Sequence, residues 1–195
     1  NLKYMKKAKI TALMPMKHNS ERLPNKNIKE FHGKPLYNYV LQSLIKSRYI
    51  EEIIINTDID EVLDMKNVNN KVRIIKRPKK LCGDFAPFFD IIEHDMNQTK
   101  AEIFLHTHST NPLVKTQTIN DAILTFMKNV EYDSLLSVTK HRKRMYYANK
   151  KPINHDPQDK LLRTQDLKPI YMDNSCLYIF TRESFFKAEK HRIGE

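Results

Sequence analysis

Apolar and polar positions follow two alternating patterns along the chain. Short apolar runs, which predict strands, occur at 8–14, 51–56, 71–76, 101–108, 134–139 and 176–180. Segments with apolar residues three and four positions apart, which predict amphipathic helices, occur at 35–49, near 60–66, and at 87–97, 116–129 and 182–191. Strands that alternate with helices are typical of βαβ units. The pattern therefore predicts an α/β fold with a mainly parallel sheet flanked by helices.

Three residues indicate where helices begin. Pro87 opens the segment 87–97, where its missing N–H has no helical partner to lose. Thr116 is a candidate N-cap of 116–129, and Asp60 is a candidate N-cap of the helix near 60–66. We expect the side-chain oxygens of Thr116 and Asp60 to accept hydrogen bonds from the first turn of their helices.

Residues 140–173 break the alternation. The segment is polar and basic, contains Pro152, Pro157 and Pro169, and shows little periodicity. A structureless stretch of this length is unusual inside a compact domain. We expect a dimerisation or substrate arm within one domain that spans 1–195, since a domain commonly contains roughly 100–200 residues.

Composition and sequence motifs indicate the cellular location of the protein. No apolar run approaches the roughly 18 residues of a membrane-spanning helix. The opening "NLKYMKKAKI" lacks the apolar core of a secretory signal. Cys82 and Cys176 are too few for a disulfide framework or a zinc cluster, and neither lies in a CxxC motif. We expect two plain thiols and a cytoplasmic protein.

The chain is strongly basic. Lysine and arginine number 34 against 23 acidic residues, which gives a net charge of +11. Such a surface attracts anions, although biased lysine and asparagine usage explains the excess as well. A phosphorylated small molecule or an acidic sugar fits this charge. Nucleic acid is an unlikely partner, because no RNA-recognition or helix-turn-helix pattern is present.

Glycine is too scarce for the common nucleotide-binding motifs. The three glycines, Gly33, Gly83 and Gly194, lie far apart. The dinucleotide fingerprint and the Walker loop both need paired glycines within a few residues, so NAD enzymes and P-loop kinases are excluded. Neither a GxSxG elbow nor an HExxH motif occurs.

The segment "MPMKHNSERLPNKN" (14–27) follows the first predicted strand. Ligands of parallel sheets bind beyond the carboxyl ends of the strands, where this segment falls. It offers cations and hydrogen-bonding groups, namely Lys17, Arg22 and Lys26 with Asn19, Ser20 and Asn27. Lysine binds phosphate as a point charge, and arginine can bind it bidentately. The pattern favours an anion-binding loop, with a solvated basic loop as the alternative.

Two other segments also follow predicted strands. In "HTHSTNPL" (106–113), His106 and His108 lie two apart and share a face, which permits a metal site, although we favour hydrogen bonding. "NTDID" (56–60) places Asp58 and Asp60 at the spacing with which nucleotide-sugar glycosyltransferases hold a divalent cation. A Mg²⁺-dependent glycosyltransferase is therefore a rival hypothesis.

The last polar segment is "RTQDLKPIYMDNSCLYIF" (163–180). It joins Arg163 and Gln165 to Asn174 just before a predicted strand. Asn174 and Tyr171 either tie down a turn or belong to a substrate-facing surface.

In order and spacing, these segments resemble the acylneuraminate cytidylyltransferase family. "LMPMKHNSERLPNKNIKEFHGKPL" is similar to its opening loop, which closes in Gly-Lys-Pro-Leu, and "NTD" resembles its Ser-Thr-Asp. "KRPKKLCGDFA" resembles its Arg-Pro…Leu…Asp segment, and "HSTNPL" its Gln-Pro-Thr-Ser-Pro-Leu. The segment 163–180 resembles its Arg-Arg-Gln-Asp…Asn-Gly…Tyr-Ile. Each motif is weak alone, but five in register with the predicted strands are specific.

The resemblance implies a Rossmann-like nucleotide-diphospho-sugar transferase fold and a cytidylyltransferase reaction. The anomeric hydroxyl of a sialic-acid-like nonulosonic acid would attack the α-phosphate of CTP and release pyrophosphate, with Mg²⁺ as cofactor. It also implies a homodimer with partly shared sites. A non-catalytic nucleotide-binding relative is the remaining alternative.

The resemblance also implies residue roles. The nucleotide-binding set is Lys17, Asn19, Ser20, Arg22, Lys26, Asn27, Arg77 and Asp84, with Arg77 at the base. The sugar-binding set is His108, Thr110, Asn111, Arg163, Gln165 and Asn174. Lys17, Lys26, Arg163 and Gln165 are expected to act directly in catalysis.

The chain departs from the family pattern at several positions. Lys17 replaces an arginine, Arg22 a residue that is often glycine, and Thr164 the second arginine before Gln165. "FAPFF" (85–89) replaces a serine-rich stretch. The family's metal-binding aspartates are expected on a strand beyond 182–191, which the printed sequence does not contain, so no metal ligand is assigned.

Overall fold

The computed structural model describes residues 10–18, 20, 23–66, 68–158, 160–189 and 193. The chain divides into two compact units. The first comprises Asn1–Leu136 and Cys176–Glu195, and the second is Ser137–Ser175. The segment 140–173, which we predict to be an arm, falls within the second unit, and its role stays a prediction.

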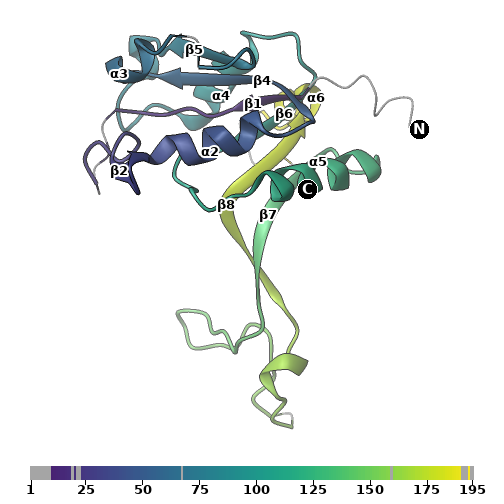
Figure 1. Ribbon diagram of the computed structural model, residues 1–195. Coiled ribbons are helices and arrows are strands. Elements are labelled where there is room, and N and C mark those ends of the chain that lie inside the picture. The colour runs from purple at the N-terminus through teal and green to yellow at the C-terminus, as the bar shows by residue number, and fades with distance from the viewer. Residues whose placement is uncertain are drawn as a thin grey trace. The chain divides into compact units, whose positions relative to one another are not determined.

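A six-stranded sheet has the order β5-β4-β1-β6-β8-β7 (Figure 1). Its strands are β1 (Ile10–Leu13), β4 (Ile50–Thr57), β5 (Val72–Lys76), β6 (Ile103–Thr107), β7 (Ser134–His141) and β8 (Ile170–Thr181). β1 pairs in parallel with β4 and β6, and β4 pairs in parallel with β5. The predicted mainly parallel sheet is therefore confirmed. β8 runs antiparallel to β6, which the periodicity does not reveal.

The helices follow the predicted order with shorter ends. They are α2 (Leu36–Ile45), α3 (Asp60–Leu63), α4 (Phe88–Met96), α5 (Thr116–Lys128) and α6 (Arg182–Lys187). Two 3-10 turns, η1 (Lys79–Leu81) and η2 (Thr164–Asp166), are additional. The mixture of strands and helices in this order is the predicted α/β class.

Alternation along the strands divides the core of the first unit into two clusters. Ile53 and Ile55 of β4 pack with buried residues of α2 and α5, whereas Ile54 between them packs with α4 and α6. Successive strand side chains point to opposite faces, so both faces of the sheet are covered by helices (Figure 1). This burial accounts for the continuous apolar run in β4.

Two predicted helix caps are wrong. Ile59 is the N-cap of α3 and Asp60 is its first helical residue, without a side-chain cap. Lys115 is the N-cap of α5, and the Thr116 hydroxyl donates instead to the carbonyl of Ser43, at 3.0 Å. That tertiary bond to Ser43 of α2 replaces the local one.

A small hairpin escaped the sequence analysis. β2 (Glu30–Phe31) and β3 (Lys34–Pro35) pair in antiparallel fashion around His32 and Gly33. Both turn residues have positive φ, 47° and 78°. A two-residue turn of this kind matches the twist of the strands it joins, and glycine adopts its second position without steric cost.

The second unit is more ordered than the sequence indicates. β7 extends to His141 and β8 begins at Ile170, so both enter the segment that lacked periodicity. Side chains bind backbone groups within the unit: Arg142 donates to the carbonyl of Gln165, and Arg144 to that of Leu162. Polar hydrogen bonds of this kind have no period, which explains why the sequence pattern did not predict them.

Within the described part of the chain, every helix is too short or too polar to cross a membrane.

Candidate active site

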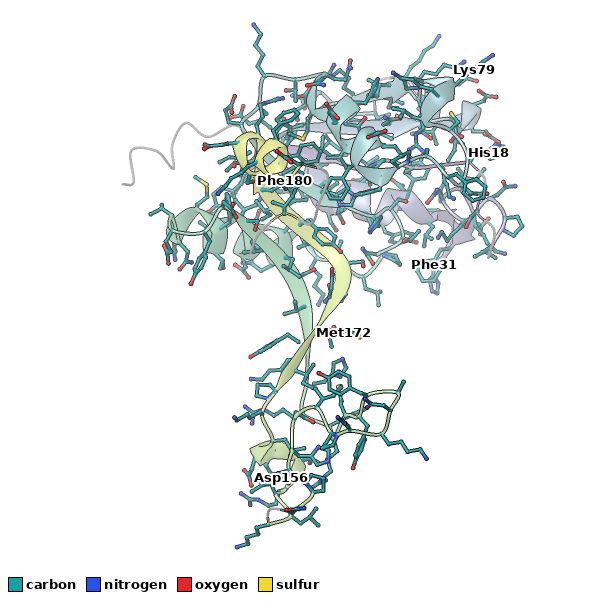
Figure 2. The ribbon with its side chains drawn as sticks, turned by 180° about the vertical axis from the view of Figure 1, so that it is seen from behind. His18, Phe31, Lys79, Asp156, Met172 and Phe180 are labelled. Atoms are coloured by element: carbon teal, nitrogen blue, oxygen red, sulfur yellow. The ribbon has the colours of Figure 1, made fainter. Side chains whose placement is uncertain are left out.

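A pocket of about 210 Å³ lies at the carboxyl ends of three strands. The loop after β1 supplies Pro15, Lys17, Ser20, Lys26 and Asn27; the residue after β5 is Arg77; α4 supplies Phe88 and Ile91; and the loop after β6 supplies His108, Ser109 and Thr110. In open α/β sheets this edge is where ligands bind. His18, labelled in Figure 2, marks the loop after β1.

The loop after β1 turns without glycine because Asn25 takes its place. Asn25 has a φ of 54°, and its carbonyl accepts from the N–H groups of Ile28 and Lys29 at 3.1 and 2.9 Å. Asparagine tolerates this left-handed conformation better than most residues. The turn brings Lys26 and Asn27 back toward the pocket.

Asn27 holds two loops together. Its Nδ2 donates to the carbonyl of Lys17 at 2.7 Å, and its Oδ1 accepts from the hydroxyl of Ser109 at 2.6 Å. The loops after β1 and β6 therefore share one amide. A ligand in the pocket meets walls that are fixed to one another.

Lys17 pairs with Asp84 at 2.5 Å between Nζ and Oδ1. The two side chains are 39% and 26% exposed. Exposed ion pairs contribute little stability, roughly 0–1 kcal/mol. An anionic ligand can therefore compete with Asp84 for Lys17 at low cost.

Hydrogen bonds to Asn56 hold the side chain of Arg77 in place. It is 5% exposed, and its Nε and Nη2 donate to the Oδ1 and the backbone carbonyl of Asn56, each at 3.0 Å. Burial lowers the pKa of Arg77, and the nearby charges of Asp58, Asp95 and Cys82 act in the opposite direction. The guanidinium remains a cation, because arginine is effectively always protonated.

Asp95 lies behind Asn56. Its Oδ1 accepts from Asn56 Nδ2 and is 3.3 Å from His94 Nδ1. Burial raises the pKa of Asp95 to about 6, while the hydrogen bonds from Asn56 and His94 and the charges of His94 and Arg77 lower it. Asp95 Oδ2 is buried and meets no hydrogen-bond partner in the described chain.

His106 packs among aromatic rings, and the hydrogen-bonding role that we favoured from sequence stays a prediction. It is 2% exposed, and its Nε2 is buried with no partner among the described residues. Its ring packs against Phe88, Tyr178 and His108, with centroids 4.9, 5.6 and 4.8 Å away. Burial lowers the pKa of His106 well below its usual value, and the charge of His108 lowers it further. His106 is thus a neutral ring that supports His108.

The described residues do not assemble a metal site by themselves. No group of three or more histidine, cysteine or acidic side chains occurs among them. Asp58 Oδ1 accepts from the backbone N–H of His18 at 2.6 Å, and Asp60 begins α3. Within the glycosyltransferase pair, Asp58 is therefore engaged in a tertiary hydrogen bond and Asp60 in a helix.

The pocket gathers many of the predicted site residues. The lining includes Lys17, Ser20, Lys26, Asn27, Arg77, His108 and Thr110. Asp84 reaches the lining through Lys17, and the backbone carbonyl of Asn111 accepts from the N–H of Val114. Asn19 and Arg22 lie outside the described residues. The roles of all these residues stay predictions.

Three predicted sugar-binding residues belong to the second unit. Arg163 Nε donates to Asp166 Oδ2 at 2.8 Å. Gln165 accepts through its carbonyl from Arg142, and Asn174 bonds the hydroxyls of Ser137 and Thr139. Their roles also stay predictions.

Sequence analysis missed the residues behind the pocket. Asn56 ends the predicted strand 51–56 and Asp95 lies in the predicted helix 87–97, and neither was a candidate site residue. A signal for Asp95 was present, because it follows Ile91 by four and Ile92 by three and so lies on the buried face of α4. A charged residue on an apolar face needs a buried partner.

Comparisons with known proteins place nearly the whole chain in a family. A family model described as cytidylyltransferase matches residues 11–194. A pseudaminic acid cytidylyltransferase of Campylobacter jejuni is 24% identical over 191 residues, which cover 93% of this chain and 82% of that protein. An N-acylneuraminate cytidylyltransferase of Escherichia coli is 28% identical over 138 residues, 70% of this chain and 33% of that protein.

Solved structures show the same fold. A CMP:2-keto-3-deoxy-manno-octonic acid synthetase complexed with CTP aligns with a TM-score of 0.70 and 14% identity, over 94% of this chain and 78% of that one. A 4-diphosphocytidyl-2C-methyl-D-erythritol synthase from Anaerococcus prevotii aligns with a TM-score of 0.64 and 12% identity, over 95% and 77%. The predicted nucleotide-transferase fold and the predicted family are confirmed: the chain belongs to the cytidylyltransferase family.

Proposed function

We propose that this nucleotidyltransferase moves CMP from CTP to the anomeric hydroxyl of a sialic-acid-like nonulosonic acid and releases pyrophosphate. One observation carries the proposal: in a cytidylyltransferase chain, Lys17, Lys26 and Arg77 meet in one pocket at the carboxyl ends of parallel strands. Relatives named for pseudaminic and N-acylneuraminic acid support such an acceptor.

The two lysines bind the triphosphate. Lys17 and Lys26 stand on the same loop, with Ser20 and Asn27 beside them in the lining. Lysine charges offset the negative charge that gathers on the phosphate oxygens as the α-phosphate is attacked. Side chains do here what backbone N–H groups of a glycine loop do elsewhere.

Arg77 reads the nucleotide base. Two of its five N–H donors bond Asn56, and its side chain also lines the pocket. The remaining donors suit the carbonyl acceptor of a pyrimidine. Arg77 is therefore the residue that favours a base with a suitably placed acceptor.

The reaction needs a proton acceptor. The sugar hydroxyl oxygen forms a bond to the α-phosphorus, the bond from phosphorus to the bridging oxygen breaks, and pyrophosphate leaves with that electron pair. The hydroxyl proton must go to a base. Among the described side chains that line the pocket, His108 is the one that is commonly neutral near pH 7 and can accept it.

The sugar itself meets Thr110 and Asn111 in the proposal, next to His108. Arg163, Gln165 and Asn174 are proposed to bind its carboxylate and hydroxyl groups, in keeping with arginine's geometry for carboxylates. Because these three belong to the second unit, their assignment rests on the family resemblance.

We also propose Mg²⁺, a homodimer and a cytoplasmic location. Mg²⁺ is commonly held by substrate phosphates with one or two carboxylates, so a three-ligand protein cluster is not required. The second unit exposes Tyr146, Leu161 and Tyr171, which suit burial against a second copy of the chain. CTP, the proposed donor, is a cytoplasmic metabolite. Omission of Mg²⁺ and sedimentation equilibrium test the first two points.

Pyrophosphate release tests the function. The protein is mixed with CTP and Mg²⁺, then with sialic, legionaminic, pseudaminic or Kdo sugar acids in turn. We expect release only with CTP and a nine-carbon acid. Release without any sugar acid, or none with the whole panel while CTP binds, contradicts the proposal.

The pH profile tests His108. His108→Gln is expected to lower kcat by roughly 10²–10⁴ while the CTP affinity stays within a few-fold. In the wild type, kcat should fall as the pH drops, because an imidazole that has taken up a proton cannot accept the hydroxyl proton. His108→Gln should lack this fall. An unchanged profile with a raised KM would make His108 a sugar-binding residue only.

A further inference from the structure

Three polar side chains form a buried row behind the pocket. Asn56 and Asp95 are each 0% exposed and Arg77 is 5% exposed. They come from three separate elements: β4, α4 and the chain after β5. Burying polar groups costs free energy unless they are paired. Here the pairing ends on a side chain that lines the pocket.

The hydrogen bonds of this row have a fixed direction. Asn56 Oδ1 accepts from Arg77 Nε at 3.0 Å, and Asn56 Nδ2 donates to Asp95 Oδ1. An amide has an acceptor on one side and donors on the other. Because Asp95 offers only an acceptor when ionised, it determines which way the Asn56 amide faces. The amide oxygen is thereby directed at the guanidinium.

We infer that Asn56 and Asp95 are positioning residues that hold the Arg77 guanidinium in the orientation that an incoming nucleotide meets. The nucleotide in this statement rests on the proposed function. The orientation itself rests on the hydrogen bonds alone. The backbone carbonyl of Asn56, which accepts from Arg77 Nη2 at 3.0 Å, fixes the second edge of the guanidinium.

Three polar side chains act on Asp95. Asn56 faces it from β4, Arg77 from the chain after β5, and His94 is its neighbour on α4. Burial raises the pKa of Asp95 to about 6. The charges of Asp58 and Cys82 also act on Arg77 and raise its pKa. A mild change of pH therefore removes the carboxylate charge and leaves the cation in place.

The direct test is the side-chain Nε–H signal of Arg77 in ¹⁵N NMR, recorded without nucleotide. In the wild type we expect a protected signal. Asn56→Ser, whose hydroxyl is too short to bridge Arg77 and Asp95, should increase its exchange with water at least tenfold. A charged hydrogen bond contributes roughly 1.5–3 kcal/mol, so CTP affinity should fall about 10- to 100-fold.

Asp95→Asn separates charge from shape. The variant keeps an acceptor for Asn56 Nδ2 and has no charge to lose. In the wild type, the Arg77 Nε chemical shift should move with an apparent pKa near 6, in step with Asp95. In Asp95→Asn that movement should be absent. The phosphates of CTP also take up protons in the range from pH 5 to 8. Their effect is the same for the wild type and for Asp95→Asn, so it cancels in the difference between the two affinities.

Ser47→Ala is the matched control. Ser47 is 0% exposed, and its hydroxyl donates to Asn120 Oδ1 at 2.7 Å, outside the pocket lining. Its loss should lower stability and leave both the Arg77 signal and CTP affinity unchanged.

Two results would overturn the inference. One is an Arg77 signal that exchanges in Asn56→Ser as slowly as in the wild type, or that still moves with pH in Asp95→Asn. The other is wild-type CTP affinity in Asn56→Ser. Failure of the wild type to bind any nucleotide would reject the proposed function instead, and the Arg77 signal would still decide whether Asn56 and Asp95 position the guanidinium.

Discussion

Two groups of residues next to the pocket hold the cations that line it in opposite ways. In the buried base, defined by Asn56, Arg77 and Asp95, the cation is nearly inaccessible and is fixed by hydrogen bonds of defined direction. In the exposed mouth, defined by Lys17 and Asp84, one ion pair faces solvent. The base is suited to selecting a ligand by shape. The mouth is suited to attracting negative charge and exchanging partners.

The difference follows from the surrounding dielectric. A charge pair near solvent is weakened by water and salt, whereas a buried pair is not and costs more to break. Substitutions in the base should therefore change affinity and selectivity strongly. Substitutions in the mouth should have smaller effects that depend on salt.

Arg77→Lys should have the largest effect. A lysine ammonium cannot reproduce the two hydrogen bonds to Asn56, and the loss of two charged bonds predicts a fall in CTP affinity of about 100-fold or more. Isothermal titration with CTP and UTP measures it. The matched control is Arg73→Lys, on β5 and paired with Glu52 away from the pocket lining, which should bind CTP normally. Equal losses in both variants would mean general damage.

Asp95→Asn should change how stability depends on pH. The folded pKa of Asp95 is raised from 3.8 to about 6, so the folded state binds this proton more tightly than the unfolded state does. The contribution of Asp95 to the stability of the wild type should therefore be fully present below about pH 4. It should be lost as the pH rises to about 6. A pKa difference of roughly two corresponds to about 3 kcal/mol.

Chemical denaturation from pH 4 to 8 measures this effect. Asp95→Asn should lack this part of the pH dependence, so its stability relative to wild type should improve as the pH rises. Parallel curves for the two proteins would show that Asp95 does not titrate in this window.

Lys17→Met should have the smallest of the three effects. Losing one exposed phosphate contact predicts a roughly tenfold fall in CTP affinity at low salt and less at high salt, because salt screens exposed charges. Lys29→Met removes the same charge from an exposed position of the same loop and should change affinity little. A loss of affinity that does not depend on salt would mean that Lys17 acts as a buried cation, as Arg77 does.

Asp84→Asn sharpens this result. Without its partner carboxylate, Lys17 no longer has to leave an ion pair when it meets phosphate. CTP affinity should rise a few-fold. A clear fall would mean that Asp84 contributes to binding by itself.

Periodic features were predictable from the sequence, and polar networks were not. The parallel strands β1, β4, β5 and β6 follow from apolar runs and helical spacing, because burial on both faces of a sheet imposes those patterns. The antiparallel β8 has no such signature, since a strand reads the same in either direction.

The candidate site divides in the same way. Lys17, Lys26, Arg77 and His108 were expected from their places after strands and from the family resemblance. Asn56 and Asp95 were missed because their function depends on a contact between β4 and α4, 39 positions apart. The aromatic surroundings of His106 were not foreseen, because Phe88 and Tyr178 come from α4 and β8.

The most direct test of the account is thermal unfolding of the wild type with CTP, UTP, ATP or GTP, each with Mg²⁺. A ligand at 100 times its dissociation constant stabilises the folded state by about 2.7 kcal/mol, or several degrees in Tm for a chain of this size. We predict the largest rise with CTP. Equal rises with all four nucleotides, or none with CTP, would contradict the assignment of this pocket to CTP.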